Sequence, residues 1–217
     1  MAKWVDTTAN IVLAVSAATV AVLLLLQPAR TRAPSGSRPP ADVPVADAGT
    51  EALNGLFPAS VRAGTRMVVF VDVECPYCAR YHETVDRISR ELPGVSVEIA
   101  HFPLPQHRFA RSGALALECA REFGHLEAFL TAAYATQDSL GLLSWAHLAN
   151  RTPIDSGRFR GCIESGRYEA TVARHLEVAH LIGVRGTPTV VVGATMFGRP
   201  PSFEELARLV GGEGERQ

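Results

Sequence analysis

The sequence lacks the charge imbalance that marks a nucleic-acid-binding protein. Its 217 residues contain 21 basic and 22 acidic side chains, for a formal net charge of −1. Lys3 is the only lysine among the basic residues, and the arginines spread along the chain without forming a block. A basic patch or stripe is the electrostatic signature of nucleic-acid binding. We therefore expect no nucleic-acid partner.

Cysteine is also scarce, and the spacing of the cysteines argues against a structural zinc site. The chain has four cysteines and seven histidines. Cys75 and Cys78 form a close pair, but Cys119 and Cys162 have no close Cys or His neighbour in the sequence. A structural zinc ion needs four ligands, which usually come from two close pairs. The spacing favours redox chemistry over zinc, and we expect no metal.

The close pair follows a run that reads as a buried strand and opens a pattern typical of a helix. Residues 68–88 read VVFVDVECPYCARYHETVDRI. Cysteines three positions apart at a helix start can close a disulfide, and the helix dipole favours a thiolate on the first. This is the chemistry of thiol–disulfide exchange.

Only one long apolar run is present, over residues 9–26. As a helix it spans about 27 Å, close to the hydrocarbon thickness of a bilayer. A secretory signal peptide is the alternative, although its apolar region is usually shorter. We favour an uncleaved membrane anchor over residues 1–27. Arg30, Arg32 and Arg38 would place the following domain inside by the positive-inside rule, whereas the redox chemistry favours the outside.

Residues 28–50 are rich in proline and poor in large apolar side chains, so they are predicted to be a flexible linker. Residues 51–214 are predicted to be the globular domain. Within it, Met67–Val71 reads as a strand, residues 75–91 as a helix that Pro76 opens, and residues 95–99 as a second strand. Strand, helix and strand over this distance predict a parallel βαβ unit.

Helical patterns then occupy residues 106–182, with breaks at Gly166 and Gly183. A strand is expected from Thr189, a turn at Gly193, a short strand near Met196, and a last helix opened by the capping box Ser202–Glu205. The domain is therefore α/β, in the order βαβ, helical block, ββα.

This order, together with three motifs, resembles the thioredoxin superfamily and within it the DsbA-like branch. The motifs are Cys75-Pro76-Tyr77-Cys78, the segment His101-Phe102-Pro103-Leu104, and Gly186-Thr187-Pro188-Thr189. The resemblance covers residues 55–212 and implies a thioredoxin-like fold with a helical insertion at about 105–184. Glutaredoxins share the CPYC sequence but would not be expected to have the insertion or the anchor.

The resemblance also implies roles for individual residues. Cys75 would be the nucleophile and Cys78 the resolving cysteine, with Pro76 and Tyr77 tuning the reactivity of Cys75. Thr187 and Pro188 would border the substrate groove, and Pro188 would be cis. An ordinary trans proline and a Tyr77 that merely packs at the surface are the plainer alternatives.

The resemblance implies further roles outside the motif. Cys119 and Cys162 would form a structural disulfide, the alternative being two buried apolar fillers. A buried acid near the resolving cysteine can accept a proton in this superfamily. Glu74 and Glu98 are the acids considered, and Glu98 is expected to face solvent. Asp72 and His82 are interpreted as surface or local structure.

The predicted function is that of a membrane-tethered thiol–disulfide oxidoreductase on the periplasmic or extracellular face. It would oxidise cysteines in exported proteins and use no cofactor beyond the Cys75–Cys78 disulfide. Its partners would be those substrates and a membrane redox partner, either a quinone-linked oxidase or an electron donor. A reductase or isomerase, and a non-catalytic peptide-binding chaperone, remain alternatives. The direction of electron flow is not encoded in the motif.

Overall fold

The computed structural model describes residues 41–57 and 64–214. No helix within these ranges is both long enough and apolar enough to cross a bilayer. The predicted anchor over residues 9–26 lies outside the described residues.

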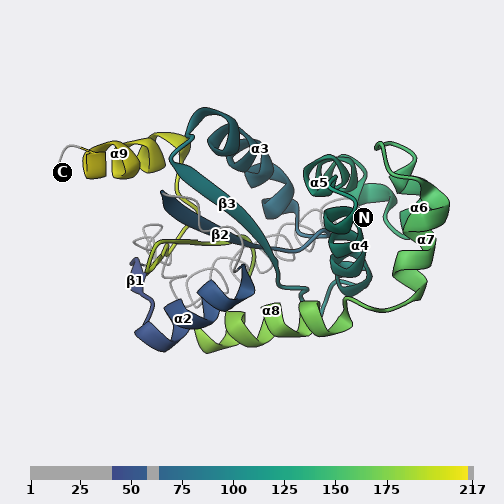
Figure 1. Cartoon of the computed structure of the whole chain (residues 1–217), viewed down its shortest axis with the longest axis horizontal. Helices are drawn as coiled ribbons and strands as arrows, with labels where there is room; N and C mark the ends of the chain where they lie inside the picture. The colour runs from purple at the N-terminus through teal and green to yellow at the C-terminus, as the bar shows by residue number, and fades with distance from the viewer. Residues whose placement is uncertain (1–40, 58–63, 215–217) are drawn as a thin grey trace, which may run out of the picture. The chain divides into compact units, whose positions relative to one another are not determined.

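A five-stranded mixed sheet forms the centre of the domain (Figure 1), in the order β1-β5-β4-β2-β3. The central strands β2 (Thr65–Val71) and β3 (Val95–His101) are parallel, and β4 (Thr189–Val192) runs antiparallel to β2. The short strands β5 (Thr195–Met196) and β1 (Val43–Pro44) complete one side. The predicted βαβ unit and the following ββα order are both confirmed.

The strand β2 contributes apolar side chains to both faces of the sheet, because successive side chains of a strand point to opposite sides. Met67 and Val69 face one core, and Val68 and Phe70 face the other; all four are buried. This explains why the strand reads as a continuous apolar run.

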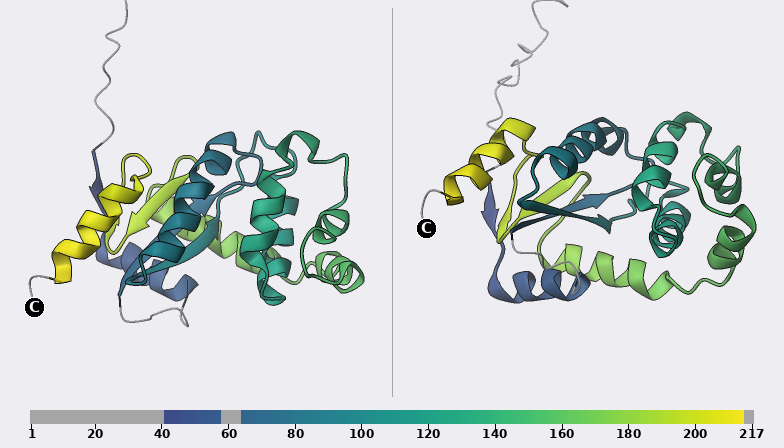
Figure 2. Two further views of the ribbon diagram at one scale, coloured as in Figure 1. Left: turned by 90° about the horizontal axis from the view of Figure 1, so that it is seen from above. Right: turned by 45° about the horizontal axis from the view of Figure 1, so that its top comes forward.

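Helices cover each face in turn (Figure 2). The helices α3 (Pro76–Glu91) and α9 (Phe203–Gly214) lie on the face that carries Met67. The helices α2 (Asp47–Leu56) and α8 (Glu169–Leu181) lie on the face that carries Val68. The domain is therefore a three-layer α/β arrangement, as expected for a sheet with two apolar faces.

A block of helices lies beside the sheet between β3 and β4. It contains α4 (Ala110–Glu122), α5 (Leu126–Tyr134), a short 3₁₀ helix (Gln137–Ser139), α6 (Trp145–Ala149) and α7 (Ser156–Glu164). The helical patterns predicted α4, α5 and α7. They missed α6, whose five residues are too few for a periodic signal.

The helix α8 was predicted to belong to the insertion, and that assignment is wrong. Val178 and Ala179 of α8 pack with Val68 and Phe70 of the sheet, so α8 is part of the sheet's own cover. It ends at Gly183, whose φ of +84° is a left-handed conformation that glycine adopts without strain. The insertion proper therefore ends before Glu169.

The predicted linker extends too far toward the domain. Residues 43–50 were assigned to a coil, but they contain β1 and the first turns of α2. Composition misled the prediction, because two residues are enough for β1 once β5 offers an edge to pair with. At the other end, the predicted capping box is present. Ser202 N–H donates to Glu205 Oε2 at 2.7 Å, and Glu205 N–H donates to Ser202 Oγ at 3.2 Å.

Candidate active site

The close cysteine pair lies at the start of α3, just after the short connection from β2. Cys75 is the N-cap residue of α3, in an extended conformation, and Pro76 occupies the first turn. Proline suits that position because its missing N–H would have no helical partner there. Cys78 lies inside the first turn on the side facing the core, and both cysteines are free thiols.

The surroundings of Cys75 favour its thiolate. Its pKa falls to about 5, chiefly because of the hydrogen bond from the Cys78 thiol. Burial opposes the shift, while Thr187 and the backbone N–H groups of Cys78 and Tyr77 add to it. Unpaired N–H groups at a helix N-terminus are the structural origin of the backbone contribution.

Cys78 is in the opposite situation. Burial raises its pKa well above the ordinary value for a thiol, and the neighbouring Cys75 raises it further. At neutral pH the pair therefore consists of one thiolate and one thiol. That division suits a nucleophile and a resolving cysteine.

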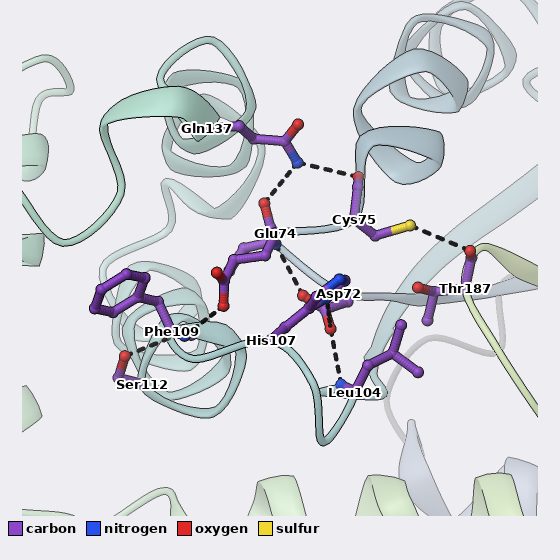
Figure 3. Close-up of polar contacts among 10 residues, drawn as sticks. Asp72, Glu74, Cys75, Leu104, His107, Phe109, Ser112, Gln137 and Thr187 are labelled. Atoms are coloured by element: carbon purple, nitrogen blue, oxygen red, sulfur yellow. Dashed lines mark hydrogen bonds and ion pairs between the residues drawn. The ribbon is translucent and has the colours of Figure 1, made fainter.

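Thr187 and Pro188 lie opposite the pair, and the bond between them is cis, as the resemblance implied. The Cys75 thiol donates to the Thr187 carbonyl at 3.2 Å (Figure 3). The Thr187 side chain lowers the pKa of both cysteines. The structure thus brings together Cys75, Cys78, Thr187 and Pro188.

A groove of about 410 Å³ runs beside the pair, and Tyr77, Arg80, Thr187 and Pro188 are among its lining residues. The Tyr77 side chain is 64% exposed. The Arg80 guanidinium lies over its ring, 4.4 Å from the centroid. Tyr77 therefore forms a wall of the groove rather than part of the core.

The loop before the motif is held by Asp72, which the sequence analysis interpreted as surface or local structure; the structure gives it the second role. Asp72 is buried, and its carboxylate accepts hydrogen bonds at 2.8 Å from the backbone N–H groups of Glu74 and Leu104 (Figure 3). His107 Nδ1 lies at the same distance from that carboxylate. Buried charge is stable when hydrogen bonds satisfy it. Asp72 thereby fixes the backbone three residues before Cys75.

The helical block contributes two more contacts to this loop (Figure 3). Gln137 Nε2 donates to the carbonyls of Val73, at 2.7 Å, and Cys75, at 3.0 Å. The Phe109 N–H donates to the Glu74 carboxylate. Glu74 is therefore engaged with the helical block. Sequence reasoning missed Gln137, and no local pattern could have found it, because its partners lie 64 and 62 positions away.

A glycine allows α4 to approach the same loop. A Cβ on Gly113 would lie 2.3 Å from Cγ2 of Val73 and 3.1 Å from the Trp145 ring. Real Cβ atoms do not come that close to a neighbouring carbon, so only glycine fits without a shift of Val73. Helix α4 therefore packs directly against the segment that carries Cys75.

The second cysteine pair lies in the helical block. Cys119 of α4 and Cys162 of α7 form a disulfide with a Cα–Cα distance of 5.9 Å, as the resemblance implied. Both cysteines are buried in the same apolar core. The bond ties together two helices that are 43 positions apart in the chain.

Three buried side chains could serve as metal ligands on position alone: His101, Glu118 and His175 have candidate ligand atoms within 4.8 Å of one another. His101 Nδ1 has no hydrogen-bond partner among the described residues, but other polar atoms of the three residues are already paired. His101 Nε2 lies 2.6 Å from Glu118 Oε1, and the His101 N–H donates to His175 Nδ1. Arg121 Nε donates to the same Glu118 oxygen at 3.2 Å. The guanidinium supplies the positive charge that the carboxylate needs, so the cluster works as a hydrogen-bonded network.

Comparison with known proteins identifies relatives of the whole domain. The family described as Thioredoxin matches residues 60–211. Among solved structures, the thiol–disulfide exchange protein alpha-DsbA2 from Wolbachia pipientis has a TM-score of 0.68 at 14% identity, covering 76% of this chain and 96% of that one. BdbD from Bacillus subtilis has a TM-score of 0.62 at 16% identity, covering 82% and 100%.

A thioredoxin-like oxidoreductase from Silicibacter pomeroyi has a TM-score of 0.62 at 22% identity, covering 76% of this chain and 98% of that one. At these identities the likeness establishes the fold. The family match over residues 60–211 includes the helical block as well as the central strands of the sheet.

Curated relatives include two proteins described as Na(+)/H(+) antiporters. NhaA 3 from Salinispora tropica is 30% identical over 149 residues, and NhaA 1 from Salinispora arenicola is 28% identical over the same length. The match covers 68% of this chain but 23% of each antiporter. The shared part is therefore a segment of those proteins.

Proposed function

This chain belongs to the thioredoxin family, and from that premise we propose that it forms disulfides in exported proteins through Cys75 and Cys78. One observation carries the oxidising direction: the Cys75 thiolate is stabilised, with a pKa of about 5. A stabilised thiolate favours the reduced form of the pair, which makes the disulfide form a stronger oxidant. The same thiolate is also a good leaving group when a client protein is released.

The reaction follows from the opposite pKa shifts of the two thiols, which favour a thiolate on Cys75 and a thiol on Cys78. A client thiolate attacks Cys75 Sγ in the Cys75–Cys78 disulfide, the sulfur–sulfur bond breaks, and Cys78 takes the electron pair and then a proton. A second client thiolate attacks the client sulfur of the mixed disulfide and displaces Cys75 as a thiolate. Two electrons pass from the client to the pair, and one disulfide forms in the client.

Client binding is assigned to the groove beside the motif. Thr187 and Pro188 border it and lie against Cys75, while Tyr77 and Arg80 form its rim. We propose that a client segment lies there in an extended conformation, with its backbone next to Thr187. A mixture of aromatic, aliphatic and cationic side chains suits a range of client sequences.

We further propose that residues 9–26 anchor the chain in the membrane and that the domain faces the periplasm or exterior. The Cys119–Cys162 disulfide supports this location, because structural disulfides persist in oxidising compartments. A membrane redox partner, a quinone-linked oxidase, would remove the electrons from the Cys75–Cys78 thiols. Membrane fractionation, combined with protease digestion of intact cells, tests the anchor and its orientation. Recovery of a shortened soluble protein would instead identify a cleaved signal peptide.

The reduction potential of the Cys75–Cys78 pair tests the direction. Purified protein is equilibrated in glutathione buffers of graded potential, trapped by alkylation and analysed by mass spectrometry. We expect a value near about −120 mV, as in strong oxidants of this fold, and a value near about −270 mV would identify a reductase. A reductase or isomerase would require an electron donor in place of the oxidase.

A non-catalytic chaperone is the remaining alternative, and it predicts a different result. The double substitution Cys75→Ser with Cys78→Ser removes the redox pair and leaves the groove residues in place. We expect it to abolish disulfide formation in a reduced, unfolded client. Full biological activity in that variant would show that peptide binding alone is the function.

A further inference from the structure

We propose that the Tyr134 hydroxyl donates a hydrogen bond to the Cys78 thiolate whenever the disulfide of the active pair opens or closes. This inference rests on the proposed function and adds to it a residue of the helical block that acts on the reacting sulfur.

The first observation is a hydroxyl group without a partner. Tyr134 is the last residue of α5, its side chain is buried, and its Oη has no hydrogen-bond partner among the described residues. A buried hydroxyl is normally hydrogen-bonded, since leaving it unpaired costs free energy. An orphaned hydroxyl at a candidate active site calls for a functional explanation.

The second observation is a small cavity that Tyr134 shares with Cys78. Its volume is about 10 Å³, and its walls include Cys78, Tyr134, His82 and the aliphatic side chains of Val69 and Leu130. A space of this size holds about one water molecule. Cys78 and Tyr134 therefore line the same small space.

Few other hydrogen-bond donors lie close enough to Cys78 to stabilise a negative charge that develops on its sulfur. Valine, isoleucine and leucine side chains form half of the cavity wall. Glu74 is engaged with the Phe109 N–H. Glu98 lies on β3 beside Val68, on the face of the sheet opposite α3. Neither acid that the sequence analysis considered lies beside Cys78.

The titratable groups around Cys78 are those of three elements. Cys75, Tyr81 and His82 belong to α3, Asp72 to the preceding loop, and Tyr134 to α5. Burial raises the pKa of Tyr134 well above its ordinary value, and the charges of Cys78, Asp72 and Cys75 add to the effect. Burial lowers the pKa of His82. Tyr134 therefore keeps its proton at neutral pH, and its O–H group is available to donate a hydrogen bond.

The chemical step needs such a donor in both directions. When a thiolate attacks Cys75, the bond between the two sulfurs breaks and its electron pair moves to Cys78 Sγ. The resulting thiolate accepts the Tyr134 O–H hydrogen bond until water in the cavity delivers a proton. In the reverse step, Cys78 loses its proton to water and attacks Cys75 Sγ, and the sulfur bound to Cys75 leaves with the electron pair of the broken bond as a thiolate. Tyr134 itself is unchanged in either case.

This role predicts an effect on rates without an effect on the equilibrium. At neutral pH Cys78 is either a thiol or part of a disulfide, because burial raises its pKa. The thiolate exists only in passing, so removal of the donor slows opening and closing by the same factor. A hydrogen bond to a charged group corresponds to roughly tenfold to a hundredfold in rate.

The experiment compares Tyr134→Phe with the unmodified chain. Oxidised glutathione is added to reduced protein at about pH 5, where Cys75 is partly ionised and Cys78 is protonated, so that the Cys75–glutathione mixed disulfide accumulates. A jump to pH 7 starts the attack by Cys78, and acid quenching with mass spectrometry follows it. Reduced glutathione added to oxidised protein gives the rate of opening, and the glutathione buffers give the potential.

We expect Tyr134→Phe to slow both steps by the same roughly tenfold to hundredfold factor, with an unchanged reduction potential. Fluorinated tyrosines at position 134, whose hydroxyls are stronger donors, should raise both rates. Unchanged rates in Tyr134→Phe would overturn the proposal. So would a slowing in one direction with a matching shift in potential, since that is the result of altered packing.

A second tyrosine provides the matched control. Tyr81 also lines the cavity, but its hydroxyl donates to the Pro201 carbonyl at 2.8 Å. Tyr81→Phe should leave both glutathione rates within about twofold of the unmodified chain, because its hydroxyl is already engaged. The proposed function fails separately, if the unmodified chain forms no Cys75–Cys78 disulfide or has a reducing potential.

Discussion

The two cysteine pairs of this domain are equally buried and chemically opposite. Cys75 and Cys78 are 3% and 2% exposed, and Cys119 and Cys162 are 1% and 2% exposed. The first pair consists of free thiols at the N-terminus of a helix, and the second is a disulfide between two helices. Burial therefore does not decide which cysteines react.

The position of each cysteine in the fold decides whether it reacts. Cys75 has backbone N–H groups, the Cys78 thiol and Thr187 around its sulfur, so charge can reside there. Cys119 and Cys162 lie within an apolar core, on helices that the chain brings together only after folding. The helical block also supplies Gln137 and Tyr134 to the active pair. The Cys119–Cys162 disulfide links two helices of that block, and the Cys75–Cys78 pair depends on side chains that the block supplies.

The sharpest way to separate the pairs is to remove one at a time. Cys75→Ser should abolish thiol–disulfide exchange with a reduced client, because no other cysteine combines a free thiol with a stabilised thiolate. Cys119→Ala with Cys162→Ala should retain exchange below its unfolding temperature. The measurement is formation of native disulfides in the client. Activity in Cys75→Ser would contradict the assignment of roles.

The second largest effect concerns stability. Loss of the Cys119–Cys162 disulfide should lower the free energy of unfolding by about 4 kcal/mol in the chain-entropy model, since the bond closes a loop of 43 positions. Urea denaturation of the double alanine variant, followed by circular dichroism, measures it. The comparison fails if stability is unchanged while reduction of Cys75–Cys78 has the larger effect.

Packing of the block against the active loop gives a smaller effect. Gly113→Ala should cost about 1–3 kcal/mol of stability, because the new methyl group meets Val73. Gly161 on α7 is the matched control, since a Cβ there meets nothing within 4 Å. Gly161→Ala should be neutral, or stabilising by up to about 1 kcal/mol. Equal losses of stability in Gly113→Ala and Gly161→Ala would show that α4 does not pack tightly against the loop.

The last prediction is a pH dependence that only the active pair should show. The Cys75 pKa is about 5 when folded and 9.0 in its reference state. Between these values the unfolded chain binds more protons, so stability of the reduced form rises with pH there. The gain is complete above pH 9 and is lost as pH falls through 5.

Denaturation of the reduced protein at pH 5, 6, 7 and 8 measures this linkage, with Cys75→Ser as the reference. The difference in unfolding free energy between the two chains should grow with pH. Parallel curves over this range would mean that the thiolate is not stabilised by folding.

Local patterns account for much of this structure. The sequence predicted α3 from Pro76 to Glu91 as observed, because a helix start at proline and an amphipathic period are both local signals. The strands β2 and β3 were found from apolar runs, each within two residues at either end. The Cys119–Cys162 pairing and the cis bond before Pro188 came from the resemblance, and the structure agrees with both.

What sequence reasoning missed depends on contacts between distant parts of the chain. Asp72 lies next to the motif, but its partner His107 is 35 positions away. Tyr134 and Gln137 reach the active pair only because α5 packs against α3. Sequence patterns do not distinguish a solvated polar side chain from a buried one when the residue lies in a loop or at a helix end. Only the fold distinguishes the two.

The edge strand β1 has a consequence for how copies of this domain meet. Val43 and Pro44 pair with Met196 and Thr195 of β5, and the Val45 N–H donates to the Ala194 carbonyl. Proline offers no N–H to a further strand, so this side of the sheet is a poor template for intermolecular β-pairing. A chain shortened to begin at residue 51 would leave the edge of β5 unpaired. An unpaired edge strand can pair with a strand of another copy and so promote aggregation. Pro44 thus limits aggregation through this edge of the sheet.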